Sequence, residues 1–146
     1  MQCPVRQTGS DEAIADADLV LTTSRSKSPV FDGVALKAGA TVVAMGSSLP
    51  TGRELGDATL RRASRVVVEW RPQSLHEAGE VVLALASGAL DTDRIIDLPA
   101  LYRQEGPWRQ SASDIIVFKS VGIGLSDAAV ARLIWQRWLV QQRGQA

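Results

Sequence analysis

Residues 18–23 read Asp-Leu-Val-Leu-Thr-Thr, a short apolar run that ends in two hydroxyl side chains. Similar runs follow at residues 41–45, 66–69 and 115–118, and stretches with helical spacing of apolar residues separate them. Short, wholly apolar strands that alternate with helices are typical of a parallel sheet with both faces covered. We therefore predict an α/β fold with a parallel sheet of about four strands, flanking helices and a strand order that follows the chain.

The same periodicity predicts four helices. Ser10 is expected to cap a helix over residues 11–15, and two more are expected at residues 53–63, with Leu55 and Leu60 inward, and at residues 74–85, ended by Gly88. The stretch from residue 91 to residue 113 has the most loop-like composition. The last helix is expected to start at Ser126 or Asp127 and to run to about Gln142, with a wide apolar face. That face comprises Val130, Leu133, Ile134, Trp138 and Leu139.

Composition narrows the class of protein. With 146 residues, 45% of them hydrophobic, and 16 basic against 16 acidic side chains, the chain fits a single domain over residues 1–146. Cys3 and His76 are its only cysteine and histidine, which excludes internal disulfides and Cys/His zinc sites and predicts no metal. A net charge of zero argues against nucleic-acid binding. No run is long enough to cross a membrane and no secretory signal is present, so a cytoplasmic protein is expected.

Several motifs, in order and at consistent spacing, resemble the ornithine cyclodeaminase/mu-crystallin family. The clearest is Phe118-Lys119-Ser120-Val121-Gly122, followed by a helix that contains Asp127. The others lie at residues 17–24, 29–31, 36–40, 45–50, 53–55 and 77–80.

This resemblance implies an NAD- or NADP-dependent protein with a Rossmann domain and a substrate and dimerisation domain. The sequence resembles only the later portion of such a protein, a truncated Rossmann-like domain with a C-terminal helix. No G-x-G-x-x-G fingerprint occurs in it. Because those glycines let the backbone approach the pyrophosphate, cofactor binding is expected to be weak or absent in this chain. Residues before Ser10 are expected to be the least settled part of the chain, with Val5 unpaired, because their usual strand neighbours are missing.

Thr22, Thr23 and Ser24 follow the first predicted strand. Ligands of α/β sheets bind at the carboxyl ends of the strands, yet such hydroxyls also commonly satisfy their own turn. The resemblance favours an edge that contacts the cofactor. It implies the same role for Lys119 and Ser120 after the last strand, where backbone amides could also hold an anionic or amide group.

Ser47 and Ser48 follow the second predicted strand and lie between Gly46 and Pro50. Their sequence alone indicates a turn, whereas the resemblance implies cofactor contacts. In ornithine cyclodeaminases proper an acid thought to act in the chemistry takes the place of Ser48, and a serine resembles the mu-crystallin and ketimine reductase branch. A hydroxyl cannot act as a general base near neutral pH, which argues against ornithine deamination.

Glu77 and Glu80 lie on the third predicted helix. The resemblance places Glu77 on the substrate side, whereas Glu80 is expected to lie on a solvated helix face. His76 is expected to be exposed, because it has no partner in the sequence that would make it catalytic.

Two classes of function remain open. The first is a truncated family member without independent catalysis that folds and assembles as a homo-oligomer, most simply a homodimer. The second is an NAD(P)-dependent oxidoreductase, similar to ketimine or imino acid reductases or to amino acid dehydrogenases, in which a missing domain or separate chain supplies the other half. The absent fingerprint favours the first. The expected interface is the unpaired edge of residues 19–23, the last helix with Trp135, Trp138 and Leu139, or both.

Overall fold

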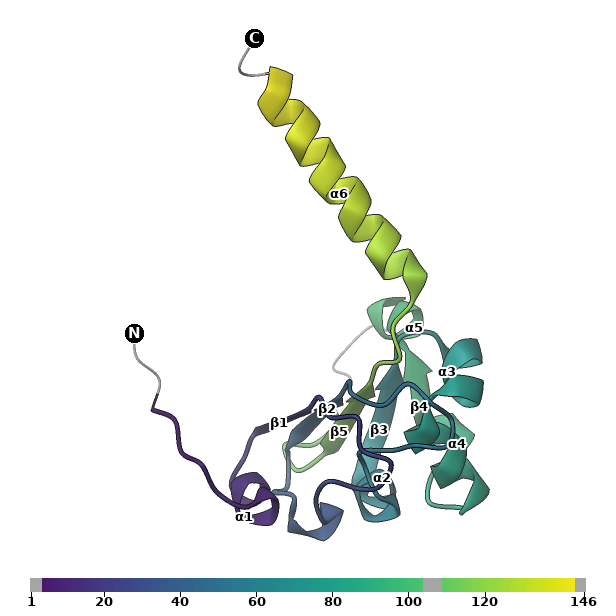
Figure 1. Ribbon diagram of the computed structural model, residues 1–146. Coiled ribbons are helices and arrows are strands. Elements are labelled where there is room, and N and C mark those ends of the chain that lie inside the picture. Colours follow the sequence, from purple (N-terminus) through teal and green to yellow (C-terminus); the bar gives the residue numbers. More distant parts are fainter. Residues whose placement is uncertain (1–3, 104–108, 144–146) are drawn as a thin grey trace.

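The computed structural model describes residues 4–103 and 109–143, and within them five strands form one parallel sheet in the order β1-β2-β5-β3-β4 (Figure 1). The α/β class and the parallel sheet are therefore confirmed. In chain order the strands are β1 Leu19–Thr22, β2 Thr41–Ala44, β3 Ala63–Val68, β4 Ile95–Asp97 and β5 Ile115–Lys119. The helices are α1 Ser10–Ala15, α2 Asp57–Arg62, α3 Arg71–Glu77, α4 Gly79–Ala86, α5 Leu98–Arg103 and α6 Gly124–Arg143, with short 3-10 turns at Gly33–Ala35 and Thr92–Arg94.

The strand order corrects one prediction. The last strand, β5, lies between β2 and β3 instead of at the end of the sheet. Its Ile115, Ile116 and Val117 are buried on both faces. A strand that is apolar on both faces is most stable at the centre of the sheet, where neighbours cover both sides.

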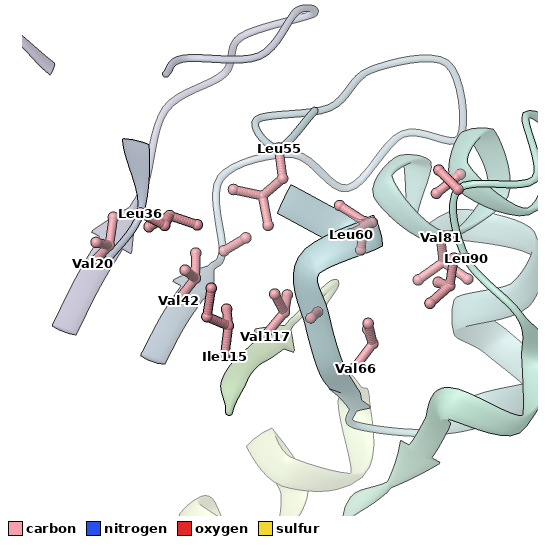
Figure 2. Close-up of a cluster of buried hydrophobic side chains, with 14 of the residues drawn as sticks. Val20, Leu36, Val42, Leu55, Leu60, Val66, Val81, Leu90, Ile115 and Val117 are labelled. Carbon is pink, nitrogen blue, oxygen red and sulfur yellow. The ribbon is translucent and has the colours of Figure 1, made fainter. Parts of the chain in front are cut away.

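The main core lies on one face of the sheet. Val20, Val42, Val66 and Val117 project to this face from four strands, and Figure 2 shows them in one cluster with side chains from α2 and α4. Leu55 and Leu60 are buried, as predicted.

The opposite face is open along β1. The side chains of Leu19 and Leu21 are 63% and 60% exposed, so the prediction that both faces are covered is wrong at this strand. Within the described residues β1 is an edge strand, because its only sheet neighbour is β2. Val5 belongs to no strand and is 94% exposed, as expected for the segment before Ser10.

Two helix boundaries differ from the prediction. The helix expected over residues 74–85 is two helices that meet at Ala78, whose ψ of 103° is extended. A Cβ on Gly79 would lie 1.8 Å from the carbonyl oxygen of Gly52, so a packed loop occupies the space at this break. The helix expected over residues 53–63 is shorter than predicted: α2 covers Asp57–Arg62, and Ala63 already begins β3.

Further differences lie at helix ends and in the stretch expected to be a loop. Gly9, not Ser10, is the N-cap of α1, and no side chain caps that end. The stretch from residue 91 to residue 113 contains β4 and α5, which are too short for periodicity to reveal. Gly88 has a φ of +69° and follows α4, which confirms it as the stop signal.

Helix α6 begins at Gly124, before the predicted Ser126 or Asp127, and extends away from the sheet (Figure 1). Leu133 and Trp135 are both exposed, and at 3.6 residues per turn they project from nearly opposite sides. The apolar side chains therefore surround the helix instead of forming one face. Trp135 and Trp138 stack on each other, with ring centroids 5.0 Å apart. In the described part of the chain, no helix is both long and apolar enough to cross a lipid bilayer.

Candidate functional site

The ends of four strands meet at one edge of the sheet, which we call the carboxyl edge. Thr22 pairs in register with Ala44, and Ala44 with Lys119, so the segments after β1, β2 and β5 lie at the same level. Val68, at the end of β3, also pairs with Lys119. The structure thus brings together the predicted residues that follow three separate strands. The carboxyl edge comprises residues 22–24, 45–48, 69–70 and 119–122.

A buried carboxylate, Glu54, joins the ends of β1 and β2. The Thr22 hydroxyl donates to its Oε2 at 3.0 Å, and the backbone amide of Gly46 donates to the same oxygen at 2.8 Å. The Ser24 hydroxyl and amide both donate to Oε1, at 2.8 and 2.5 Å. Burial raises the pKa of Glu54, but the hydrogen bonds from Ser24, Gly46 and Thr22 outweigh it and hold that pKa below its usual value.

A second buried acid, Glu80, corrects the sequence prediction. It was expected on a solvated helix face, yet it is completely buried, and its Oε2 lies 3.1 Å from Nζ of the equally buried Lys119. Its other oxygen accepts from the Glu54 amide at 2.8 Å. Lys119 also donates to the carbonyl oxygen of Ser47. This ion pair links α4 and β5 to two points of the loop after β2, at Ser47 and at Glu54.

A third acid, Glu69, fixes the turn between β5 and α6. Its Oε2 accepts from the amides of Val121 at 3.0 Å and Gly122 at 2.8 Å. Gly122 has a φ of +80°, a conformation that favours glycine. The amides that the sequence suggested for an anionic ligand are therefore bound by a carboxylate of the chain itself.

The predicted contact residues divide by what their side chains touch. Thr23 and Ser48 are exposed, and within the described residues their hydroxyls form no hydrogen bond. The hydroxyls of Thr22 and Ser24 are engaged by Glu54, and the Ser47 hydroxyl donates to the Gly52 carbonyl at 2.9 Å. Ser120 is buried, and its amide donates to the Ala44 carbonyl at 3.0 Å. Thr23 and Ser48 are therefore the hydroxyls of this edge that face solvent.

Glu77 and His76 lie on the exposed surface of α3. Glu77 accepts a hydrogen bond from Gln73 at 2.8 Å, and Gln73 also donates to the Gly122 carbonyl at 3.2 Å. Glu77 is thereby connected to the turn after β5. The exposure predicted for His76 is confirmed.

The sequence prediction missed Glu54 and Glu69. Glu54 lies within the motif at residues 53–55 that resembles the family, and no role was predicted for it. One signal was available. The hydroxyl and amide groups at three strand ends are hydrogen-bond donors, and those that are buried require acceptors. Which acid supplies the acceptor depends on tertiary placement and cannot be found from local spacing.

The residues of the carboxyl edge fit the uncharged end of a nicotinamide nucleotide. Amide and ribose groups need hydrogen-bond donors and acceptors without a fixed charge, which the hydroxyls of Thr23 and Ser48 provide. The edge is also compact, since a Cβ on Gly46 would lie 1.8 Å from the Ser24 carbonyl oxygen. The loops after β1 and β2 are therefore packed directly against each other at this point.

The fold and its edge define a Rossmann-like α/β sheet of the dinucleotide-binding class. The family model of the ornithine cyclodeaminase/mu-crystallin family matches residues 2–142, and the chain belongs to this family. It is 33% identical over 135 residues to a Delta(1)-pyrroline-2-carboxylate reductase of Bacillus cereus, covering 92% of this chain and 41% of that protein. The chain thus spans about two-fifths of the length of this relative.

Solved structures agree with the family assignment. A probable ornithine cyclodeaminase from Bordetella pertussis Tohama I superposes with a TM-score of 0.88 at 48% identity, covering 97% of this chain and 45% of that one. The Thermococcus litoralis Delta(1)-pyrroline-2-carboxylate reductase, solved with NADH and L-proline, gives a TM-score of 0.81 at 25% identity. That alignment covers 92% of this chain and 42% of that one.

Proposed function

We propose that this chain forms the nicotinamide-facing part of an NAD(P)-dependent imino acid reductase fold, and that the 146-residue chain has no independent catalysis. The observation that carries the proposal is the carboxyl edge, where Thr23 and Ser48 present exposed hydroxyls from neighbouring parallel strands. The chain spans about two-fifths of the length of its relatives, which supports the proposal that it acts together with further polypeptide. The proposal includes the cytoplasmic location expected from the sequence.

An imine is the substrate class we favour. Two of the similar proteins are reductases of Delta(1)-pyrroline-2-carboxylate, a cyclic imino acid. Ser48 supports reduction over ornithine deamination, because its hydroxyl can bind a cofactor amide but cannot act as a general base near neutral pH. When bound, a reduced nicotinamide supplies the hydride for such chemistry.

The residues of this chain would have two roles, contact with the cofactor and positioning of the loops. Thr23 and Ser48 would contact the nicotinamide end, with Ser120 at the end of the neighbouring strand β5. Glu54 and the Glu80–Lys119 pair would hold the loops that carry these hydroxyls. The predicted cofactor role of Lys119 thereby becomes one of positioning, since its ammonium group is engaged by Glu80 and by the Ser47 carbonyl.

Assembly is part of the proposal. The open edge of β1 and the apolar surface of α6 support a homo-oligomer, most simply a two-fold dimer. A second candidate is an active oxidoreductase in which another polypeptide of the family supplies the remaining half. The same open edge favours it, because a further parallel strand could pair there.

Titration of the chain with NADH and NADPH, followed by tryptophan fluorescence, tests the proposal. Trp70 follows β3 at the carboxyl edge and is 51% exposed, so a bound nicotinamide would quench it. We expect no saturable change at micromolar cofactor from the chain alone. A chimera in which it replaces the matching part of the Bordetella pertussis relative should bind, and Thr23→Val with Ser48→Ala should weaken that binding about tenfold.

Thr8→Val serves as the control in the same chimera, because this hydroxyl lies before α1 and away from the carboxyl edge. Saturable micromolar binding by the chain alone would show that it is an independent cofactor-binding protein. A chimera that binds equally well with and without the two hydroxyls would contradict their role.

A further inference from the structure

A hollow of about 410 Å³ lies between the loops that follow β1 and β2. We call it the basic hollow. Its rim carries the cationic side chains of Arg25 and Lys27 together with the hydroxyl side chains of Ser48 and Thr51. The remaining lining residues are Ser26, Gly46, Ser47, Leu49 and Gly52.

Both cations are available. Within residues 4–103 and 109–143, neither Arg25 nor Lys27 forms an ion pair or a side-chain hydrogen bond. The carboxylate bonded to these loops is Glu54, and its oxygens accept from Thr22, Ser24 and Gly46. Two positive charges therefore face one hollow without a bonded counter-charge.

The floor of the hollow is held by buried groups. Ser47 donates to the Gly52 carbonyl, and the buried Lys119 donates to the Ser47 carbonyl from the interior. Gly52 lies where the two loops meet, since a Cβ there would be 3.3 Å from the Ser47 hydroxyl and 3.8 Å from Lys27 Cα. A ligand would therefore bind to loops that are already positioned, which lowers the entropy cost of binding.

We propose that the basic hollow binds a small oxyanion, a phosphate or carboxylate group, between Arg25 and Lys27. The planar guanidinium of Arg25 can donate two parallel hydrogen bonds to the oxygens of such a group, and Lys27 adds a point charge. The hydroxyls of Ser48 and Thr51 can donate to further oxygens. The site adds a charged contact beside the uncharged contacts at Thr23 and Ser48. It does not rest on the proposed reductase function, because the oxyanion is recognised by the charges and hydroxyls of the hollow itself.

Titration with inorganic phosphate and, separately, with acetate tests this site by two-dimensional amide NMR on the full chain. Sodium chloride keeps the ionic strength constant. We expect saturable shifts at millimolar anion, concentrated in residues 25–27 and 46–52. A response to phosphate alone identifies a phosphate site, and a response to acetate as well identifies a carboxylate site.

The double variant Arg25→Gln/Lys27→Gln should weaken the binding about tenfold or more, as expected for the loss of charge-assisted hydrogen bonds. Arg132→Gln/Arg137→Gln on the exposed α6 removes the same charge and should leave the affinity within about twofold. Equal weakening in both variants, or shifts spread over the whole surface, would overturn the proposal. The cofactor titration uses a different ligand and signal, so the two proposals fail separately.

Discussion

Glu80 and Lys119 form an ion pair of 3.1 Å in which both side chains are completely buried. One residue lies near the start of α4 and the other ends β5, the central strand. Because the pair also bonds to the backbone of Glu54 and of Ser47, it connects the interior to both ends of the loop after β2. A buried pair with such additional hydrogen bonds is costly to break from one side.

We expect Lys119→Met to lower the free energy of unfolding by about 3–5 kcal/mol, because Glu80 is left charged and buried without its partner. Urea denaturation measures this loss. Adding Glu80→Gln to Lys119→Met should recover part of it, since the uncompensated charge is removed. Lys37→Met is the control, as Lys37 pairs with Asp18 at the surface and should have little effect. A loss no greater than that of the control would contradict the role of the pair.

Glu54→Gln should lower the free energy of unfolding by about 1–3 kcal/mol at neutral pH, because an amide cannot accept every hydrogen bond that the carboxylate accepts. The pKa of Glu54 in the folded chain is below the ordinary value of 4.5, so its stabilisation is complete above that value. It is lost as the pH falls through the lower folded-state pKa.

The difference in unfolding free energy between the wild type and Glu54→Gln should therefore shrink on acidification below pH 4.5. Urea denaturation over a pH series measures it. Asp18 and Asp114 also have lowered pKa values, from hydrogen bonds with Lys37 and with the Ser111 amide. They are present in both proteins and cancel in the difference. A difference that stays constant with pH would show that the Glu54 charge contributes nothing.

Gly46→Ala should destabilise the carboxyl edge by about 1–3 kcal/mol or more, as overpacking commonly does. Its Cβ would lie 1.8 Å from the Ser24 carbonyl oxygen and 2.5 Å from Glu54 Oε1, so the loops after β1 and β2 must separate. Thermal unfolding measures the loss. Gly124→Ala is the matched control, because no atom of another segment lies within 4 Å of its added Cβ. Equal melting temperatures for the two variants would contradict the close contact.

Local pattern was sufficient to locate four of the strands. The predicted runs at residues 18–23 and 41–45 match β1 and β2 to within one residue at each end, because apolar strands bounded by polar turns have a clear signature. Periodicity says nothing about which strands are neighbours, so the central position of β5 was missed. That position depends on pairings far apart in the sequence, such as Val66 with Val117.

The candidate site was predicted in part for the same reason. The hydroxyls after β1 and β2 were found from their place at strand ends and from the family resemblance. Glu80 was misplaced because an acid on a helix is usually solvated, and its partner Lys119 lies on a different element. Helical spacing reports which face a residue occupies, but not whether another segment covers that face.

The last prediction concerns self-association through β1 and α6. Leu19 and Leu21 lie on the exposed side of a strand with an unpaired edge, and such an edge readily pairs with another chain. Charged side chains on an edge strand oppose this pairing. We therefore expect the wild-type chain to be a dimer at micromolar concentration and Leu19→Lys/Leu21→Lys to be a monomer, as measured by light scattering.

Two comparison variants separate the possible interfaces. Leu49→Lys changes a leucine of similar exposure in the loop after β2, so it should leave the dimer intact. Trp135→Ser/Trp138→Ser removes the stacked rings of α6 and should produce a monomer only if that helix forms the interface. A wild-type chain that stays monomeric at micromolar concentration would defeat the prediction, because the open edge and the apolar helix would then need no second copy.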